Sequence, residues 1–195
     1  MPEATAAGEL PWRPTADQVR AAAGTTLPDV IAPGLRVVFV GINPGLYTAA
    51  IQHHFGRPGN RFWKLLHLAG FTPRQLGPFE EQRLLDLGIG VTNLVARATA
   101  TAAEVGRDEL RAGGVELAAR VERHRPDWVA MLGMTAYRTA FRCPGAGIGE
   151  RPERLGGARV WLLPNPSGLQ ARYQMPELIG LFSDLASAAG FPAAR

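Results

Sequence analysis

Residues 37–46 read VVFVGINPGL, in which an apolar run of strand length passes directly into a loop that contains glycine, asparagine and proline. Val and Phe favour strands, and a run without polar residues indicates a strand that is buried on both faces. Such strands are typical of parallel sheets covered by helices on both sides. In open sheets of this kind, ligands bind beyond the carboxyl ends of the strands. Asn43 comes just after this strand, so we expect it at a binding site.

Further apolar runs of strand length follow, and helix-length segments separate them. The expected strands are Arg36–Gly41, Gly90–Val95, Asp127–Gly133 and Arg159–Pro164. The expected helices are a short one near Asp17–Ala23 capped by Thr15, then Asn60–Ala69, Gly77–Leu87, Arg107–Arg123, Thr135–Arg142 and Pro176–Ala189. Cys143–Gly157, which contains proline and glycine, is expected to be an irregular excursion. The alternation predicts a three-layer α/β/α sandwich around a mainly parallel, four-stranded sheet.

Length and composition bound the class of protein. A chain of 195 residues suits one domain with a sizeable core, which we place at residues 26–195 after an N-terminal segment, 1–25, that is expected to be partly disordered. The apolar runs are far shorter than the roughly 18 residues of a membrane span. Acidic Glu3 and Glu9 argue against a secretory signal, and a lone Cys143 fits a reducing compartment. We therefore expect a cytoplasmic protein without a membrane partner.

The charges are unevenly distributed. Residues 30–79 contain no Asp or Glu but hold five basic residues, namely Arg36, Arg57, Arg61, Lys64 and Arg74. Residues 154–176 also lack acids and hold Arg154, Arg159 and Arg172. An arginine-rich composition alone could cluster charges in this way. The alternative, which we favour, is that two positive segments contact phosphates.

A second loop resembles the first. Residues 164–169 read PNPSGL and follow the last expected strand. Asn-Pro and Gly are common turn formers, so one such loop by itself indicates only a turn. Two such loops, both leaving strands and both within acid-free segments, favour a functional site. The loops contain neither of the glycine-rich nucleotide-binding patterns, the four histidines lack the spacing of metal ligands, and no nucleophile-elbow motif is present.

Five motifs in order give a family resemblance. GINPGL at 41–46, Phe55, NRFWKLL at 60–66, GVTNLVAR at 90–97 and NPSGL at 165–169 resemble the mismatch-specific uracil-DNA glycosylase and thymine-DNA glycosylase family of the uracil-DNA glycosylase superfamily. The resemblance implies a monomeric hydrolase of base excision repair, with no metal and no organic cofactor. Its activity would be the flipping and excision of uracil, and by extension of thymine or exocyclic adducts, from double-stranded DNA with G·U or related mismatches.

The chemistry of this reaction suits the residue types. A uracil that leaves as a delocalised anion needs less acid catalysis than a sugar leaving group, for which glycosidases commonly use two carboxylates. It needs base extrusion, donors for the developing charge and a positioned water. Lys64 is the only lysine and lies in neither loop, which favours a monofunctional enzyme that leaves an abasic site.

The resemblance also implies roles by matched position. Asn43 would be the catalytic residue that orients the attacking water. Ile42, Gly45 and Asn165 would line the base pocket, and Phe55 would stack on the base unless it is an ordinary core aromatic. Contacts to DNA would come from Thr48, Arg61, Lys64, Ser167, Gly168, Leu169, Gln170 and Arg172, with Leu169 filling the gap in the duplex.

Two departures from the family pattern leave questions open. Arg172 stands one position later than the arginine that usually follows the second loop. Asn93 either hydrogen-bonds a base edge or caps the end of a strand, and both interpretations stand. Two other functions also stay open, namely an α/β enzyme that acts on a free nucleotide and a non-catalytic protein that binds DNA lesions.

Overall fold

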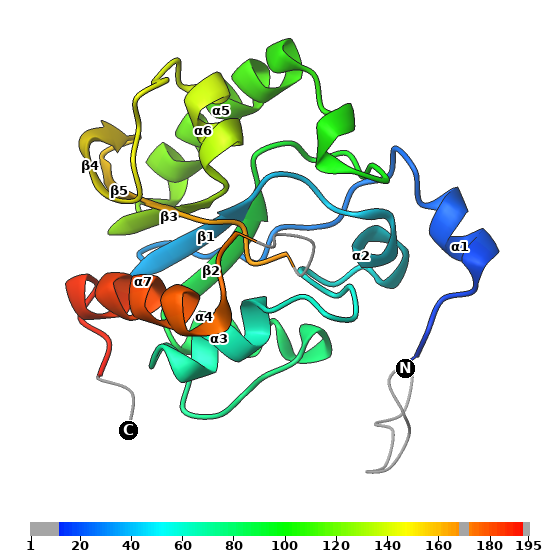
Figure 1. The fold of residues 1–195 in the computed structure, drawn as a ribbon, viewed down its shortest axis with the longest axis horizontal. Coiled ribbons are helices and arrows are strands. Elements are labelled where there is room, and N and C mark those ends of the chain that lie inside the picture. Colours follow the sequence, from blue (N-terminus) through cyan, green and yellow to red (C-terminus); the bar gives the residue numbers. More distant parts are fainter. Residues whose placement is uncertain (1–11, 168–171, 193–195) are drawn as a thin grey trace.

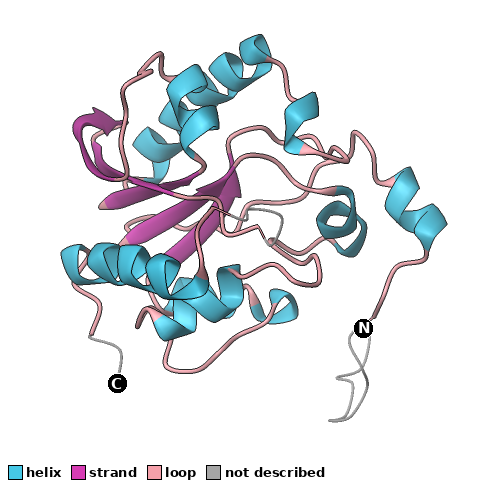
Figure 2. Ribbon diagram, viewed as in Figure 1, coloured by secondary structure: helices cyan, strands magenta, loops and turns pink. Residues whose placement is uncertain are grey.

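A computed structural model describes residues 12–167 and 172–192. In this part of the chain, five strands form one sheet in the order β2 (Ile89–Asn93), β1 (Val37–Gly41), β3 (Trp128–Leu132), β5 (Ala158–Leu163) and β4 (Gly149–Leu155). The first four strands are parallel, and β4 pairs antiparallel with β5 at one edge. The expectation of a mainly parallel sheet is confirmed (Figure 2).

Helices cover both faces of the sheet (Figure 1). One layer contains α3 (Phe62–Leu68), α4 (Arg83–Asp86) and α7 (Met175–Ala188), and the opposite layer contains α5 (Arg107–His124) and α6 (Met134–Ala140). Two short helices, α1 (Ala16–Ala21) and α2 (Leu46–Ile51), lie beyond the carboxyl end of β1, and single turns occur at Pro78–Glu80 and Ala102–Glu104. This arrangement is the expected three-layer α/β/α sandwich.

The apolar run of β1 is explained by the two helix layers that cover its two faces. Val37 and Phe39 face the α3 and α7 layer, whereas Val38 and Val40 face the α5 and α6 layer, and all four are fully buried. The ring of Phe39 packs edge-on against Phe62 of α3 with centroids 5.5 Å apart. A strand that is buried on both sides cannot alternate polar with apolar residues, which is why the sequence of β1 is continuously apolar.

The expected count of four strands is wrong. β4 lies inside the segment 143–157 that was expected to be irregular, and it adds an antiparallel edge. Its residues, GERPERL, alternate between exposed and half-buried positions, so no apolar run marks the strand. Charged residues and proline are typical of edge strands because they discourage further pairing. The helix α2 was also not expected, because it has only six residues and begins at a glycine without a side-chain cap.

The other helix predictions agree with the structure in position. Thr15 caps α1 and forms a capping box with Gln18, as expected from the sequence. The expected helix at 77–87 is divided into a single turn and the short α4. Within the described residues, no helix is long and apolar enough to cross a membrane.

Candidate active site

The two Asn-Pro loops meet at one cavity of about 290 Å³ beyond the carboxyl ends of the sheet. The first loop contributes Ile42, Asn43 and Gly45, and the second contributes Asn165 and Ser167. The wall of the cavity also includes Thr48, Phe55 and Asn93. The cavity therefore brings together residues that lie far apart in the sequence, and it contains every described residue that was predicted to contact the base.

The first loop is held by backbone hydrogen bonds to the chain that follows β2. The amide of Leu94 donates to the carbonyl of Gly41 at 2.8 Å, and the amide of Val95 donates to that of Ile42 at 2.9 Å. The amide of Thr99 donates to the carbonyl of Pro44 at 3.1 Å. The loop thus continues the ladder between β1 and β2 beyond the sheet, which fixes its backbone without a ligand.

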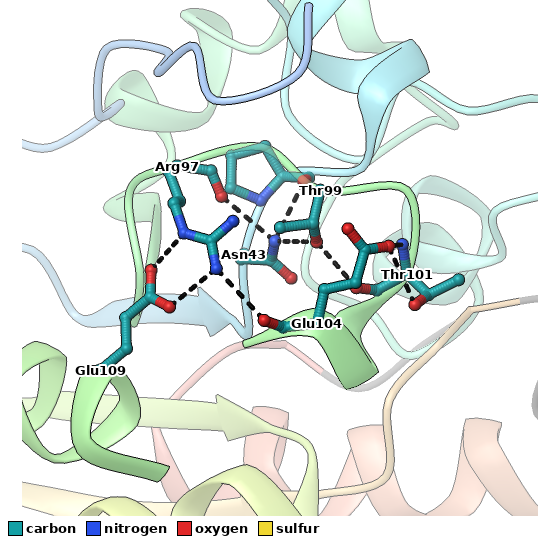
Figure 3. A network of polar contacts seen from close by, with 7 residues as sticks. Asn43, Arg97, Thr99, Thr101, Glu104 and Glu109 are labelled. Carbon is teal, nitrogen blue, oxygen red and sulfur yellow. Dashed lines mark hydrogen bonds and ion pairs between the residues drawn. The ribbon is translucent and has the colours of Figure 1, made fainter. Parts of the chain in front are cut away.

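Three acceptors fix the side-chain amide of Asn43 (Figure 3). Its nitrogen donates to Thr99 Oγ1 at 2.6 Å, to the carbonyl of Arg97 at 3.1 Å and to the carbonyl of Pro44 at 3.3 Å. The hydroxyl of Thr99 donates its only proton to the carbonyl of Thr101 at 2.8 Å, so it must accept from Asn43. The nitrogen therefore faces this cluster, and the oxygen Oδ1 remains as an acceptor that no described donor occupies.

An ion pair holds the segment that supplies these acceptors. The guanidinium of Arg97 binds both carboxylate oxygens of Glu109 on α5, at 2.6 and 2.8 Å, and donates to the carbonyl of Glu104 at 3.1 Å (Figure 3). This hydrogen bonding raises the pKa of Arg97 and lowers the pKa of Glu109. From the sequence, Arg97 was part of the motif at 90–97 without a predicted role, and Thr99 was not predicted. The only signal for Thr99 was its position two residues past that motif.

Phe55 forms a flat wall of the cavity. Its backbone has a positive φ of 52°, an uncommon conformation for a bulky residue, and its ring stacks on Phe62 with centroids 3.9 Å apart. The buried carboxylate of Glu81 supports this segment, because it accepts from the amide of His54 at 2.7 Å and from His53 Nδ1 at 2.8 Å. Phe55 therefore packs on the core and also lines the cavity, and its stacking on a base stays a prediction.

Asn93, at the end of β2, lines the cavity and is 9% exposed. Its nitrogen Nδ2 lies 3.5 Å from Nδ1 of the buried His54. Its oxygen Oδ1 occupies the space beside Gly41, where an added Cβ would come within 2.5 Å of it. A side chain at position 41 would therefore displace the Asn93 amide, and both interpretations of Asn93 stay predictions.

The second loop is held by a turn and by an arginine. Oδ1 of Asn165 accepts from the amide of Ser167 at 2.9 Å. The guanidinium of Arg61 donates to the carbonyls of Pro166, Ser167 and Tyr173 at 2.9–3.1 Å. Arg61 was expected to contact DNA, but these donors are directed at protein carbonyls. Its position indicates that it holds the two arms of the loop together.

The remaining predicted DNA contacts have different surroundings. Thr48 is buried in the cavity wall, whereas Lys64 on α3 and Arg172 are exposed. The guanidinium carbon of Arg172 lies 5.5 Å from the ring centre of Tyr173. Gly168, Leu169 and Gln170 lie outside the described residues. The side chain of Arg172 thus lies at the surface, close to the second loop in the sequence.

The charge of the cavity is a further property of the site. No Asp or Glu is found among the described residues that line it, and Arg57 is part of its rim. Across residues 12–167 and 172–192, no group of three or more His, Cys, Asp or Glu side chains could hold a metal ion. The polar groups that face the cavity are mainly amides and hydroxyls, which can orient a neutral molecule and stabilise a developing anion.

Comparisons with known proteins identify the family and the fold of the chain. The model of the family described as the uracil DNA glycosylase superfamily matches residues 28–185. The fold is similar to the solution NMR structure of a candidate uracil DNA glycosylase from Methanosarcina acetivorans, with a TM-score of 0.58 and 19% sequence identity. That match covers 83% of this chain and 98% of the other chain. At this identity the structural match shows the fold, and the family match includes both loops of the cavity.

Proposed function

Because the chain belongs to the uracil DNA glycosylase superfamily, we propose that it is a monofunctional DNA glycosylase that hydrolyses the bond between uracil and deoxyribose. Its substrate would be double-stranded DNA with G·U or related mismatches, and its product an abasic site. The observation that carries the proposal is the amide of Asn43, whose nitrogen is bound by three acceptors while its oxygen is left for a water molecule.

In the proposed reaction, Asn43 Oδ1 accepts a hydrogen bond from water and orients the water oxygen towards C1′ of the sugar. The electron pair of the glycosidic bond leaves with the base, and water bonds to C1′ and then loses a proton to the solvent. An amide is not a base, so Asn43 contributes by position and not by proton removal. We therefore propose that bond breaking leads and that water attack follows on a cationic sugar.

The leaving base would depart as an anion. The cavity has no described carboxylic acid that could protonate it, so its charge must be stabilised by hydrogen bonds and by the positive rim. This requirement favours bases whose negative charge is delocalised over carbonyl oxygens, as in uracil. It disfavours bases that need protonation before they leave.

The walls of the cavity suit a flipped base. One face of the Phe55 ring is covered by Phe62, and we propose that the base stacks on the other. A Cβ at Gly45 would meet no atom within 4 Å, so the cavity is open there. We propose that this space admits a substituent on C5 of the pyrimidine, which would allow thymine to enter at a slower rate of excision.

A single-turnover assay tests the proposal. Labelled duplexes with G·U, A·U or G·T, and a single strand with uracil, are incubated with excess enzyme and then cleaved with alkali at abasic sites. We expect cleavage of G·U to be the fastest, and Asn43→Ala to slow it by roughly 10²-fold or more while duplex binding is kept.

The same assay separates the alternatives. An enzyme for free nucleotides would leave all of these DNA substrates uncleaved, and it would instead turn over dUMP in a parallel incubation. A lesion-binding protein would bind the G·U duplex without base release. Either result, or an Asn43→Ala variant with the turnover of the wild type, would contradict the proposal.

A further inference from the structure

We propose that His54 is a positioning residue that sets which end of the Asn93 amide faces the base, so that the cavity presents an oxygen acceptor. An oxygen acceptor suits the uracil of the proposed function, whose ring N–H lies between two carbonyl groups. This inference rests on the proposed glycosylase function, because it concerns the base that the same cavity would hold.

The contacts of His54 determine which of its ring nitrogens carries a hydrogen. Its Nε2 lies 3.0 Å from the carbonyl oxygen of Pro28, which can only accept, so Nε2 must carry a hydrogen. The residue is 1% exposed, and burial lowers the pKa of its imidazole below 6.5. A neutral imidazole has one N–H, so at neutral pH the other nitrogen, Nδ1, is a bare acceptor.

The side-chain amide of Asn93 is oriented by its contact with His54. Its side-chain nitrogen Nδ2 lies 3.5 Å from His54 Nδ1. A bare imidazole nitrogen can accept a hydrogen bond from an amide nitrogen, whereas an amide oxygen in that place would face a second lone pair. The amide oxygen is therefore directed to the opposite side, over Gly41 and beside the ring of Phe55.

The backbone leaves Asn93 little other freedom. Asn93 pairs with Gly41 in the sheet, and its backbone carbonyl accepts a hydrogen bond from Arg120 Nη1 at 3.2 Å. Only the side-chain torsions remain, and a flip of the amide exchanges its oxygen and nitrogen. His54 thus decides between two states of similar shape and opposite hydrogen-bonding character.

The orientation of the Asn93 amide determines which bases can form a hydrogen bond with it. Uracil, thymine and hypoxanthine carry a ring N–H on the edge used for base pairing, and an amide oxygen accepts from it. Cytosine and adenine carry a bare ring nitrogen there, which an amide oxygen repels. A site built to accept a hydrogen bond rejects analogues that lack the donor more strongly than a site that relies on shape.

Protonation of His54 would reverse the orientation. Burial lowers the pKa of the His54 ring most, and the charge of His53 adds to this effect, whereas the hydrogen bond to Pro28 and the charges of Glu81 and Asp29 favour the protonated ring. With a hydrogen on Nδ1, the Asn93 nitrogen would meet another donor, so the amide would turn and present its nitrogen to the cavity. We expect the rate of uracil excision to fall at pH values below 6.5, and we expect this fall to require both His54 and Asn93.

A double-mutant cycle tests the proposal. His54→Phe keeps a buried ring and removes the acceptor, and we expect single-turnover excision from a G·U duplex to slow by about tenfold, the scale of one misdirected hydrogen bond, with unchanged duplex binding. In an Asn93→Ala background the same substitution should change the rate by less than about twofold. A loss of equal size in both backgrounds would show that His54 only supports the loop, and would overturn the proposal.

His53→Phe is the matched control. The ring of His53 bonds the Glu81 carboxylate that also accepts from the backbone amide of His54, but it has no hydrogen bond to Asn93 in the described structure, so its substitution should leave the rate of excision close to that of the wild type. An effect as large as that of His54→Phe would assign the loss to the anchor at Glu81, and would contradict the proposal.

A measurement on the wild-type protein is independent of activity and of variant folding. The ¹⁵N shifts of His54 should show a protonated Nε2 and a bare Nδ1 at pH 7. A proton on Nδ1 would overturn the proposal even if uracil is excised. If the tautomer is as expected and no uracil is released from any substrate, the glycosylase function fails while the orientation of Asn93 stands.

Discussion

The side-chain nitrogen of Asn43 lies 2.6 Å from the hydroxyl oxygen of Thr99, and that hydroxyl already donates to the carbonyl of Thr101. A threonine hydroxyl has only one proton, so the donor in the first contact must be Asn43. The orientation of the proposed catalytic amide is thus determined by a residue that has no part in the chemistry. If the amide turned over, its oxygen would face three acceptors, which is unfavourable.

The variant Thr99→Val tests this relationship. It keeps the shape of the buried side chain and removes the acceptor, so we expect excision from G·U duplexes to slow by about tenfold, equivalent to roughly 1.4 kcal/mol, the net value of one hydrogen bond. Thr99→Ser should recover most of the rate. The measurement is the single-turnover rate at saturating enzyme.

Thr72→Val is the control for this variant. Thr72 is buried to a similar degree and donates to the carbonyl of Arg74, away from the cavity. It should lose stability without a change in the excision rate. If Thr99→Val excised uracil as fast as the wild type, Thr99 would not position Asn43.

Gly45→Ala tests the open space beside the base. The backbone of Gly45 has φ of −75°, which any residue can adopt, and a Cβ there meets no atom within 4 Å. We therefore expect the free energy of unfolding to change by less than about 0.5 kcal/mol, as at other unconstrained sites. The added methyl group would occupy the space proposed for a C5 substituent, so the rate on G·T should fall more than the rate on G·U. An equal loss on both substrates would place the C5 position elsewhere.

The fold was largely predictable because its signals are local. Buried parallel strands such as β1 and β3 have continuous apolar sequences, and the loops that follow them contain the motifs. The strand β4 gave no such signal, because an edge strand with one half-buried side needs only alternation, and its alternate residues are charged.

The residues that orient the two cavity amides were less predictable from the sequence than the amides themselves. Asn43 and Asn93 stand at the ends of strands, where the topology of the sheet places a site. Thr99 and Asn43 are 56 positions apart in the chain, and His54 and Asn93 are 39 apart. Such pairs depend on how loops fold back on one another, and no spacing rule in the sequence indicates them.

Arg61 shows the same limit for a charged residue. From the sequence, its position in an acid-free segment favoured a contact with phosphate, but its guanidinium donates to the carbonyls of Pro166, Ser167 and Tyr173. A basic residue in a positive segment can therefore serve the fold, because backbone carbonyls accept hydrogen bonds as phosphate oxygens do.

Arg61→Ala should consequently reduce stability as well as excision. The loss of hydrogen bonds from a charged donor to three carbonyls is expected to cost about 2 kcal/mol in the free energy of unfolding, since such bonds contribute about 1.5–3 kcal/mol each and water replaces part of them. Arg61→Lys should recover little, because one ammonium group cannot reach the acceptors that the planar guanidinium spans. Urea denaturation gives the free energies.

The neighbouring Lys64 provides the contrasting case. It is exposed on α3, and Lys64→Ala should change the free energy of unfolding by less than about 0.5 kcal/mol. If it contacts a phosphate, duplex affinity should decrease and the slope of log K against log salt should become shallower by about 1. Unchanged slopes would remove Lys64 from the proposed DNA-binding surface. An unchanged free energy for Arg61→Ala would likewise return Arg61 to that surface.

The buried imidazole of His54 should make folding depend on pH in the acid range. Its folded pKa lies below 6.5 because burial disfavours the charged ring, whereas in the unfolded chain it titrates near 6.5. The unfolded state then binds more protons than the folded state between these two values, so stability is full above pH 6.5 and falls as the pH drops towards the folded pKa. His54→Phe should remove this part of the pH dependence. The side chain of His67 on α3 is partly exposed, and the control variant His67→Phe should retain the pH dependence. Free energies of unfolding in urea at pH values between 5 and 8 measure the difference, and a His54→Phe variant with the same slope as the wild type would show that another group titrates there.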